Sequence, residues 1–306
     1  MMVEMINEPC GVLIINKPQG PTSHDIVNRV RRLYSTKKVG HTGTLDPMAT
    51  GVLVVLIGRA AKACEYSLSD RKKYTATLRL GIETDTEDTT GTILKEYPVN
   101  ATEADVKNVL TSFKGKIKQI PPMYSALKVG GKKLCDIARE GGTVEREARE
   151  IEVYSISAEY INDNDYKLVV ECSAGTYIRT LCADIGKALG CGGAMASLER
   201  SAACGFSIDE AHTIEEIEKL SIEERLALLR PVEEIFSELE AVKLPSFYER
   251  LFRSGCEIYL KKAKLPEFSE GTRLRVLDSK GNFFALGEVK SYENGLAIKS
   301  IKLFVI

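Results

Sequence analysis

The segment Gly40-His41-Thr42-Gly43-Thr44-Leu45-Asp46-Pro47-Met48-Ala49-Thr50-Gly51 places a single carboxylate in a loop that favours unusual backbone conformations. Its three glycines accept positive φ values or the close approach of another segment. Pro47 disfavours the helical conformation for Asp46 and shifts it towards an extended one. A helix is expected before this loop and a buried strand after it, so Asp46 should be held between rigid flanks.

The charges near Asp46 in the sequence predict an ionised carboxylate. Asp46 is the one acidic residue between Ile26 and Cys64, and that stretch also holds seven bases: Arg29, Arg31, Arg32, Lys37, Lys38, Arg59 and Lys62. Nearby positive charge favours the anion. An ionised aspartate flanked by groups that attract phosphate suits a nucleophile acting on a nucleic acid. The alternative is a turn-forming aspartate, which is common before proline.

The composition predicts a globular protein of one large and one small domain, or of two comparable domains. No apolar run reaches ~18 residues, so no membrane helix is expected. The N-terminal residues lack the pattern of a secretory signal, and eight cysteines without such a signal predict free thiols in the cytoplasm.

A net charge of −1 hides an uneven distribution. Residues 209–240 carry a net charge of −8, whereas residues 246–306 carry +4. Modest positive fields steer polyanions, although they are also common on proteins that bind no nucleic acid. The acidic stretch predicts a domain boundary near Glu240, and hence domains 1–240 and 241–306.

Hydrophobic periodicity predicts an α+β order of elements. The first helix is expected to be capped by Thr22 or Ser23, with Asp25 in its first turn. Strands are expected at 11–16, 52–57, 74–80, 150–160, 166–172, 273–278, 283–290 and 296–305. Further helices are expected at 101–113, 134–139, 177–189 and 214–229.

Other patterns that could carry chemistry are weaker. His41 is equally suited to a structural hydrogen bond, and three histidines without a CxxC pair give no metal site. The acidic run 83–88 lacks the glycine and distal glutamate of a calcium loop, so we expect a solvated turn. Nothing matches GxxxxGK[ST], and no GxGxxG follows a strand, which disfavours nucleotide-driven chemistry.

The run Gly175-Thr176-Tyr177-Ile178-Arg179-Thr180 combines an aromatic ring with a guanidinium. In an extended chain Tyr177 and Arg179 would project to one side, whereas in a helix they would diverge. The pair suits stacking on a base and pairing with a carboxylate or phosphate. A helix start with a core tyrosine is the alternative.

Taken together, the chain resembles the TruB family of bacterial tRNA pseudouridine-55 synthases. Four segments in the family's order carry the resemblance: GVLIINKPQGPTS from Gly11, GHTGTLDPMATG from Gly40, PPMYSALKVGGKKL from Pro121 and CSAGTYIRTLCADIG from Cys172. The last sixty residues resemble a PUA domain more weakly. The resemblance implies a pseudouridine synthase domain with a large mixed, mainly antiparallel sheet and flanking helices, followed by a small β-rich PUA-like domain that binds RNA.

The resemblance also implies the central residues of a catalytic site. Asp46 would be the nucleophile, and Arg179 would pair with it. Tyr74 would pack against the target base and serve in proton transfer. Tyr177 would lie in the same pocket.

Further substrate-binding roles follow from the same resemblance. Leu198 would line the base pocket, and His41 would sit where the displaced nucleotide is handled. Lys17 and Pro18 would support the pocket from the first strand. Glu199 departs from the family, which often has a second basic residue there, and this affects a peripheral RNA contact.

The reaction implied by the family needs no cofactor, because uridine and pseudouridine are isomers. A carboxylate can hold one fragment covalently or deprotonate the sugar while the base turns, and both routes stay open. The implied partner is the T-arm stem–loop of tRNA, bound by a monomer without a protein partner or a membrane. Two alternatives remain: an RNA-folding protein whose isomerase activity is secondary, and a guide-RNA-dependent relative that works in a multi-protein particle.

Overall fold

The computed structural model describes residues 8–66 and 71–304 and is built on one large sheet. Its main path runs β1-β3-β12-β4-β11-β10-β7, with β2 paired to β3 and β13 to β12. Neighbouring strands are antiparallel except β12 and β3, so the predicted mixed, mainly antiparallel sheet is confirmed. The strands are β1 (Gly11–Lys17), β2 (Val39–His41), β3 (Thr50–Ile57), β4 (Lys72–Leu80), β7 (Gly115–Gln119), β10 (Arg149–Asn162), β11 (Asp165–Cys172), β12 (Gly193–Ala203) and β13 (Phe206–Ser207).

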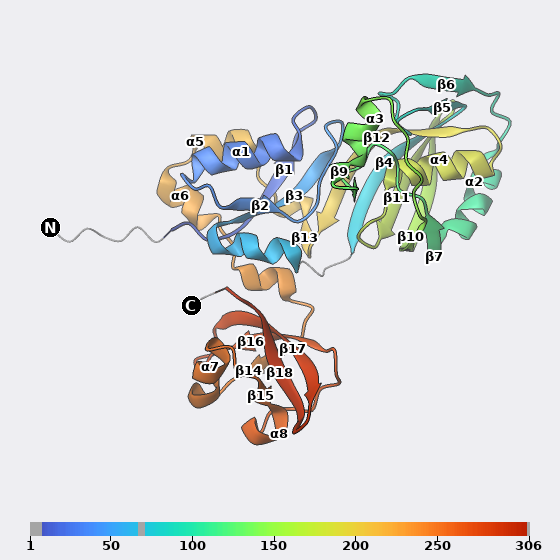
Figure 1. Ribbon diagram of the computed structural model, residues 1–306. Helices are drawn as coiled ribbons and strands as arrows, with labels where there is room; N and C mark the ends of the chain where they lie inside the picture. The colour runs from blue at the N-terminus through green and yellow to red at the C-terminus, as the bar shows by residue number, and fades with distance from the viewer. Residues whose placement is uncertain (1–7, 67–70, 305–306) are drawn as a thin grey trace.

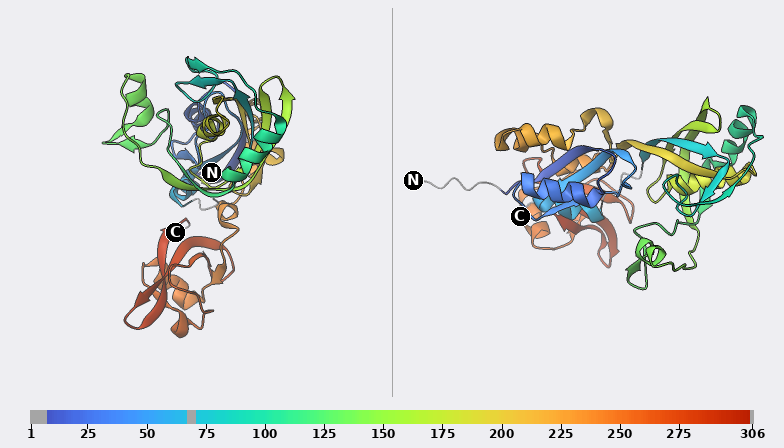
Figure 2. Two further views of the ribbon diagram at one scale, coloured as in Figure 1. Left: turned by 90° about the vertical axis from the view of Figure 1, so that its right-hand side faces the viewer. Right: turned by 90° about the horizontal axis from the view of Figure 1, so that it is seen from above.

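Helices cover the sheet in two groups (Figure 1). The helices α1, α5 and α6 lie together near β1, whereas α2 and α4 lie near β10 and β11. Seen nearly end-on in Figure 2, left, α4 lies inside the curve of the sheet. The helices are α1 (Ser23–Leu33), α2 (Glu103–Val109), α3 (Leu134–Arg139), α4 (Ile178–Ala188), α5 (Ile214–Lys219) and α6 (Ile222–Ala227), with 3-10 turns at 58–65, 110–113, 208–210 and 232–236.

Two small hairpins extend from this body. The first pairs β5 (Ile82–Thr84) with β6 (Ile93–Glu96), and the second pairs β8 (Lys128–Val129) with β9 (Lys132–Lys133). The second hairpin leads directly into α3, and both views of Figure 2 show this segment standing apart from the sheet.

The strands β1 and β3 are buried on both faces. In β3, Leu53, Val55 and Ile57 pack into one hydrophobic cluster, and the alternate residues pack into another. A continuous apolar run is the pattern expected for such a strand. The same clusters take up alternate residues of β1. Both strands thus form a rigid base for the loops at their ends.

The start of α1 is fixed by a reciprocal cap, as the sequence predicts. The Thr22 side chain accepts a hydrogen bond from the Asp25 backbone amide, and the Asp25 carboxylate accepts one from the Thr22 amide. These bonds satisfy two of the backbone groups that a helix start leaves open.

The C-terminal residues form a second sheet with a core of its own. The sheet runs β14-β16-β17-β18-β15, and Phe252 and Phe284 are among its core residues. Its elements are β14 (Ala241–Lys243), α7 (Ser246–Arg253), β15 (Ile258–Tyr259), α8 (Leu260–Ala263), β16 (Arg273–Leu277), β17 (Phe283–Tyr292) and β18 (Gly295–Leu303). This sheet lies below the large one in Figure 1 and touches it through a shared apolar cluster that includes Phe236, Leu286 and Phe304.

Three predictions about elements need correction. The central strand β12 was not expected. The helix expected at 214–229 is two helices, because Leu220 is extended and Ser221 caps α6. The helix expected at 101–113 ends at Val109 and continues as a 3-10 turn. The last strand ends at Leu303, and the predicted end at Val305 lies outside the described residues. No helix in the described ranges has the length and apolarity to cross a membrane.

Candidate functional site

Asp46 lies in the loop of residues 42–49 between β2 and β3, which we call the Asp46 loop. The loop is fastened to the start of α1, because the Ser23 hydroxyl donates to the Leu45 carbonyl and accepts from the Leu45 amide at 2.9 and 2.8 Å. Leu45 is buried in the core, whereas the Asp46 side chain keeps 37% of its surface exposed. The carboxylate is thus held on a fixed backbone and remains open to solvent.

Arg179, the second residue of α4, is the cation that faces Asp46. Its Nε atom lies 3.1 Å from Oδ2 of Asp46, so the expected pairing is confirmed. The guanidinium is almost fully buried. Its Nη1 donates to the Thr86 carbonyl at 3.1 Å, and its Nη2 donates to the Tyr124 carbonyl at 2.7 Å. These bonds fix the orientation in which Arg179 meets the carboxylate.

Asp88 is a second carboxylate on the same guanidinium. Its Oδ2 lies 3.5 Å from Nη1 of Arg179, and its side chain is only 7% exposed. Its Oδ1 accepts hydrogen bonds from the hydroxyls of Thr86 and Thr90 and from the Thr90 amide. The expectation of a solvated turn at 83–88 is therefore wrong for Asp88. The run contains both a buried acid and the backbone that supports Arg179.

The pKa of Asp46 lies above its ordinary value, chiefly because partial burial disfavours the anion. The positive charges of Arg179 and Lys17 lower this pKa, whereas the negative charge of Asp88 raises it further. The seven bases of the flanking sequence are not among these charges. Arg29, for example, pairs with Glu215 and Glu218. The predicted cause of ionisation is therefore wrong: the cations that favour the Asp46 anion come from β1 and α4.

Lys17 supports the Asp46 loop from the end of β1. Its side chain is fully buried, and Nζ donates to the carbonyls of Ala49 at 2.7 Å, Pro18 at 2.9 Å and Pro47 at 3.4 Å. Burial lowers the pKa of Lys17 from 10.5 to about 8, although the nearby Asp46 carboxylate opposes the shift. Lys17 thus supports the Asp46 loop, and the role expected for it in a substrate pocket stays a prediction.

Tyr74 and Arg200 lie side by side on adjacent strands. Tyr74 is buried in β4, and burial raises the pKa of its hydroxyl, whereas the Arg200 guanidinium opposes that shift. The two residues are direct partners in the register of β4 and β12. Arg200 was not among the predicted site residues. Its place two residues after Leu198, itself a predicted site residue, was the available signal, but β12 was not predicted and its pairing with β4 therefore was not either.

The remaining predicted site residues surround this cluster less directly. His41 is half-buried in β2, its Nδ1 is buried without a hydrogen-bond partner among the described residues, and burial lowers its pKa. Leu198 is buried in β12, opposite Ala76.

Tyr177 is extended immediately before α4, so neither of the two simple arrangements with Arg179 applies. Its backbone amide and carbonyl both bond to the Gln119 side chain, and its ring is partly exposed. Tyr177 is thus not a core residue. Its place in a base pocket stays a prediction.

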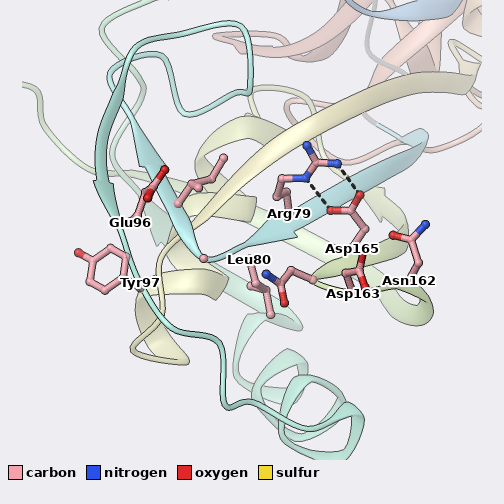
Figure 3. Close-up of a pocket in the computed structure, with 10 residues that line it drawn as sticks. Arg79, Leu80, Glu96, Tyr97, Asn162, Asp163 and Asp165 are labelled. Carbon is pink, nitrogen blue, oxygen red and sulfur yellow. Dashed lines mark hydrogen bonds and ion pairs between the residues drawn. The ribbon is translucent and has the colours of Figure 1, made fainter.

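A separate hollow of about 340 Å³ lies at the far end of β4 (Figure 3). Its walls come from the end of β4, from β6 and from the turn between β10 and β11. Arg79 on its rim is paired through two hydrogen bonds with Asp165, as Figure 3 shows. None of the residues described above lines this hollow, so it is distinct from the Asp46 cluster. Among residues 8–66 and 71–304, no three His, Cys, Asp or Glu side chains gather as metal ligands would.

Comparison with known proteins links this geometry to one family. Residues 31–178 match the model of the TruB family pseudouridylate synthase N-terminal domain, and residues 179–237 match that of the tRNA pseudouridylate synthase B C-terminal domain. The chain is 47% identical to tRNA pseudouridine synthase B of Alkaliphilus oremlandii over 81% of its length and 83% of that protein. It is 41% identical to the enzyme of the same name from Clostridium tetani, over 96% of this chain and 99% of that protein.

Similarity to a solved structure extends over the whole chain. A chain in the crystal structure of a Cbf5–Nop10–Gar1 complex superposes with a TM-score of 0.75 at 25% identity, covering 100% of this chain and 88% of that one. A chain in an H/ACA particle bound to a substrate RNA superposes with a TM-score of 0.73 at 23% identity. The second likeness concerns the fold alone.

Proposed function

The chain belongs to the TruB family of pseudouridylate synthases, and from that premise we propose that it converts uridine 55 in the T-loop of tRNA to pseudouridine, with Asp46 as the nucleophile. The enzyme class, a tRNA pseudouridine synthase and hence an isomerase, follows from its relatives. The observation that carries the assignment of Asp46 is its ion pair with Arg179 at 3.1 Å, on a fixed loop with the carboxylate open to solvent.

The chemistry requires one bond to break and one to form in the same nucleotide. The N1–C1′ bond of uridine breaks, the base turns, and C5 bonds to C1′; C5 loses its proton and N1 gains one, so the product is an isomer of uridine. Asp46 either attacks the sugar or removes a proton from it, and a carboxylate is suited to both. Arg179 stabilises the anion before the reaction and fixes its direction.

The target base must leave its stack to reach Asp46, at a cost of about a few kcal/mol. Tyr74 and Leu198 supply an aromatic and an apolar surface near Asp46 to receive it, and Tyr177 adds a second ring by this proposal. In this proposal His41, at the edge of the Asp46 loop, lies where the displaced nucleotide is handled. In this proposal Tyr74 also serves in proton transfer.

The decisive experiment compares Asp46→Asn with Asp165→Asn on a T-arm stem–loop and on whole tRNA. Asp165 is a matched control because it is also ion-paired with an arginine, at 2.6 Å, far from the cluster. We expect Asp46→Asn to abolish pseudouridine formation and Asp165→Asn to retain it. A comparable rate in Asp46→Asn would overturn the nucleophile assignment, and mapping the product to another uridine would overturn the specificity.

We propose further that residues 241–306 form a PUA-like RNA-binding domain. The support is its separate sheet and the exposed lysines on α8, Lys261 and Lys262. Reversing these two charges should weaken tRNA binding and reduce the salt dependence of log Kd by about one per lost phosphate contact. Lys107→Glu, on an exposed part of the large body, is the control. Unchanged affinity in the α8 variant would contradict this role.

A tRNA-folding role beside catalysis is a second proposal, favoured by the same basic C-terminal domain. Asp46→Asn separates the two activities, because it removes the reacting carboxylate and leaves the RNA-facing lysines. The variant should still refold misfolded tRNA if the role exists.

The chain is further proposed to act in the cytoplasm as a monomer without a protein or guide-RNA partner. Activity of the purified protein on the bare stem–loop, together with a monomer mass in solution, tests that statement. A requirement for other components would instead place it with the guide-dependent relatives.

A further inference from the structure

Arg200 is a buried cation whose hydrogen bonds go to backbone carbonyls rather than to a carboxylate. Its side chain is 2% exposed, and it forms no ion pair within the described residues 8–66 and 71–304. Its Nε donates to the Val52 carbonyl at 2.8 Å, Nη2 to Gly43 at 3.0 Å and Nη1 to Thr44 at 3.4 Å. These carbonyls lie on both sides of Asp46 in the sequence. One guanidinium therefore bridges the two ends of the Asp46 loop.

The backbone of Arg200 is held between two neighbouring strands. In register, Arg200 stands opposite Gly51 of β3 on one side and opposite Tyr74 of β4 on the other. Gly51 has a φ of +99°, and a Cβ atom there would lie 2.3 Å from the Arg200 carbonyl oxygen. The close approach of β3 to β12 thus needs glycine at that position.

We propose that Arg200 is a positioning residue for the isomerisation: it sets the separation between the Asp46 loop and Tyr74. It holds the loop through the Gly43 and Thr44 carbonyls and β3 through the Val52 carbonyl, and it lies opposite Tyr74 on β4. One rigid group therefore positions both the Asp46 loop and Tyr74. Only an arginine offers a planar fork of donors that reaches three divergent carbonyls. Lys17 holds the loop at Pro47 and Ala49, but its bonds do not extend to β4.

The protein contains a matched control for this role. Arg225 also donates to three backbone carbonyls, those of Ile217, Leu33 and Glu218, at 3.0, 3.3 and 2.8 Å. It joins α6 to α5 and α1, away from the Asp46 loop. A lysine at either position keeps the positive charge but lacks the planar set of donors that reaches three carbonyls. The two substitutions therefore remove the same kind of contact at two places in the fold.

The experiment measures tritium release from C5-labelled uridine in tRNA by wild type, Arg200→Lys and Arg225→Lys, with tRNA affinity and Tm for each. We expect Arg200→Lys to lose about 100-fold in kcat, the cost of displacing a reacting group by about 1 Å. KM and tRNA affinity should stay within twofold. Arg225→Lys should lower Tm and leave kcat within twofold.

Three results would overturn the proposal. A kcat for Arg200→Lys within threefold of wild type would show that the fork is dispensable. A loss confined to KM with a smaller salt dependence would make Arg200 an RNA phosphate contact. Equal losses of kcat in both variants would make its role one of general stability.

Chemical rescue adds a readout that a merely structural role would not give. In Arg200→Ala, added guanidinium ions at non-denaturing concentration should restore part of kcat, whereas sodium ions at equal ionic strength should not. Should Arg200→Ala not fold, Arg200→Lys alone decides the matter. The inference rests on tRNA pseudouridylation but not on its position: product at a uridine other than 55 would refute the proposed specificity and leave the comparison of kcat intact.

Discussion

Arg179 meets Asp46 with Nε at 3.1 Å, while its two terminal nitrogens are engaged elsewhere. Nη1 and Nη2 donate to the carbonyls of Thr86 and Tyr124, and Nη1 also faces Asp88. The Asp46 carboxylate is therefore paired with the Nε side of the guanidinium rather than with its two terminal nitrogens. The orientation of Arg179 towards Asp46 therefore depends on the backbone at Thr86 and Tyr124, both far from Asp46 in the sequence.

This arrangement predicts that lysine cannot replace Arg179. A lysine ammonium could reach Asp46 or the carbonyls, but not both, because it is a single donor centre. We expect Arg179→Lys to reduce kcat by about two orders of magnitude with little change in tRNA affinity, measured by single-turnover pseudouridine formation. Arg79→Lys, at the exposed pair with Asp165, is the control and should be near wild type. A loss seen only in affinity would argue for an RNA contact.

The pH dependence of the rate should reflect the charges around Asp46. Because the pKa of Asp46 is raised, the acid limb of kcat/KM should lie above pH 3.8, and the rate should fall as the carboxylate gains its proton. Asp88 contributes to that raised pKa, so Asp88→Asn should move the acid limb to lower pH. The pH profile checks this directly. A shift of the limb to higher pH would mean that Asp88 acts mainly by orienting Arg179.

The lowered pKa of Lys17 predicts that the stability of the fold depends on pH. Its pKa is about 8 in the folded chain, whereas the ordinary value for lysine is 10.5, so between these pH values the unfolded chain binds a proton that the folded chain lacks. The contribution of Lys17 to the free energy of unfolding should therefore rise with pH in that window, by at most roughly 3 kcal/mol. Denaturant unfolding of wild type and Lys17→Met from pH 7 to 10 measures it. A difference that stays constant with pH would contradict the lowered pKa.

Gly51→Ala should be far more damaging than a comparable glycine substitution elsewhere. A Cβ atom at Gly51 adds a positive-φ strain of about 1–2 kcal/mol and a contact of 2.3 Å with the Arg200 carbonyl. Gly190 has a φ of +74° with nothing within 4 Å of such an atom, so Gly190→Ala isolates the strain. Thermal unfolding should show a much larger loss for Gly51→Ala. Equal losses would mean that the strands can separate at no cost.

The contact between the two sheets predicts a large effect of Phe236. Its ring lies 6.0 Å from that of Phe283 and 5.7 Å from that of Phe304, and it is fully buried. Phe236→Ala should lower the free energy of unfolding by about 3–5 kcal/mol. Phe247, which is 58% exposed, is the control, and Phe247→Ala should change it by less than about 0.5 kcal/mol. Denaturant titration distinguishes the two, and similar values would mean that the domains are not coupled through this cluster.

The sequence predicts elements well where local pattern and tertiary burial agree. The run from Val52 to Ile57 is apolar at every position because both faces of β3 are covered. The cap at Thr22 is a local feature and was readable without the fold. The pairing of Asp46 with Arg179 came from a family resemblance rather than from spacing.

What the sequence did not predict depends on long-range pairing. The segment 193–203 mixes small, charged and apolar residues without clear alternation, and it is a strand because β4 and β3 flank it. Asp88 belongs to an acidic run that predicts a solvated turn, yet its side chain is buried and faces Arg179 of α4. Two of the bases near Asp46 in the chain, Arg29 and Lys38, pair with other acids. Proximity in sequence was thus a poor guide to the electrostatics of the site.

The parallel contact between β3 and β12 spans only the pairs Glu199–Thr50 and Arg200–Gly51, and it joins segments about 150 residues apart in the chain. During synthesis, a nascent polypeptide that has not yet emerged past β12 cannot close this seam, and its Asp46 loop lacks the contacts of Arg200. Truncated translation products would therefore be catalytically silent. Competence to modify RNA arises late, when nearly the whole large body has left the ribosome.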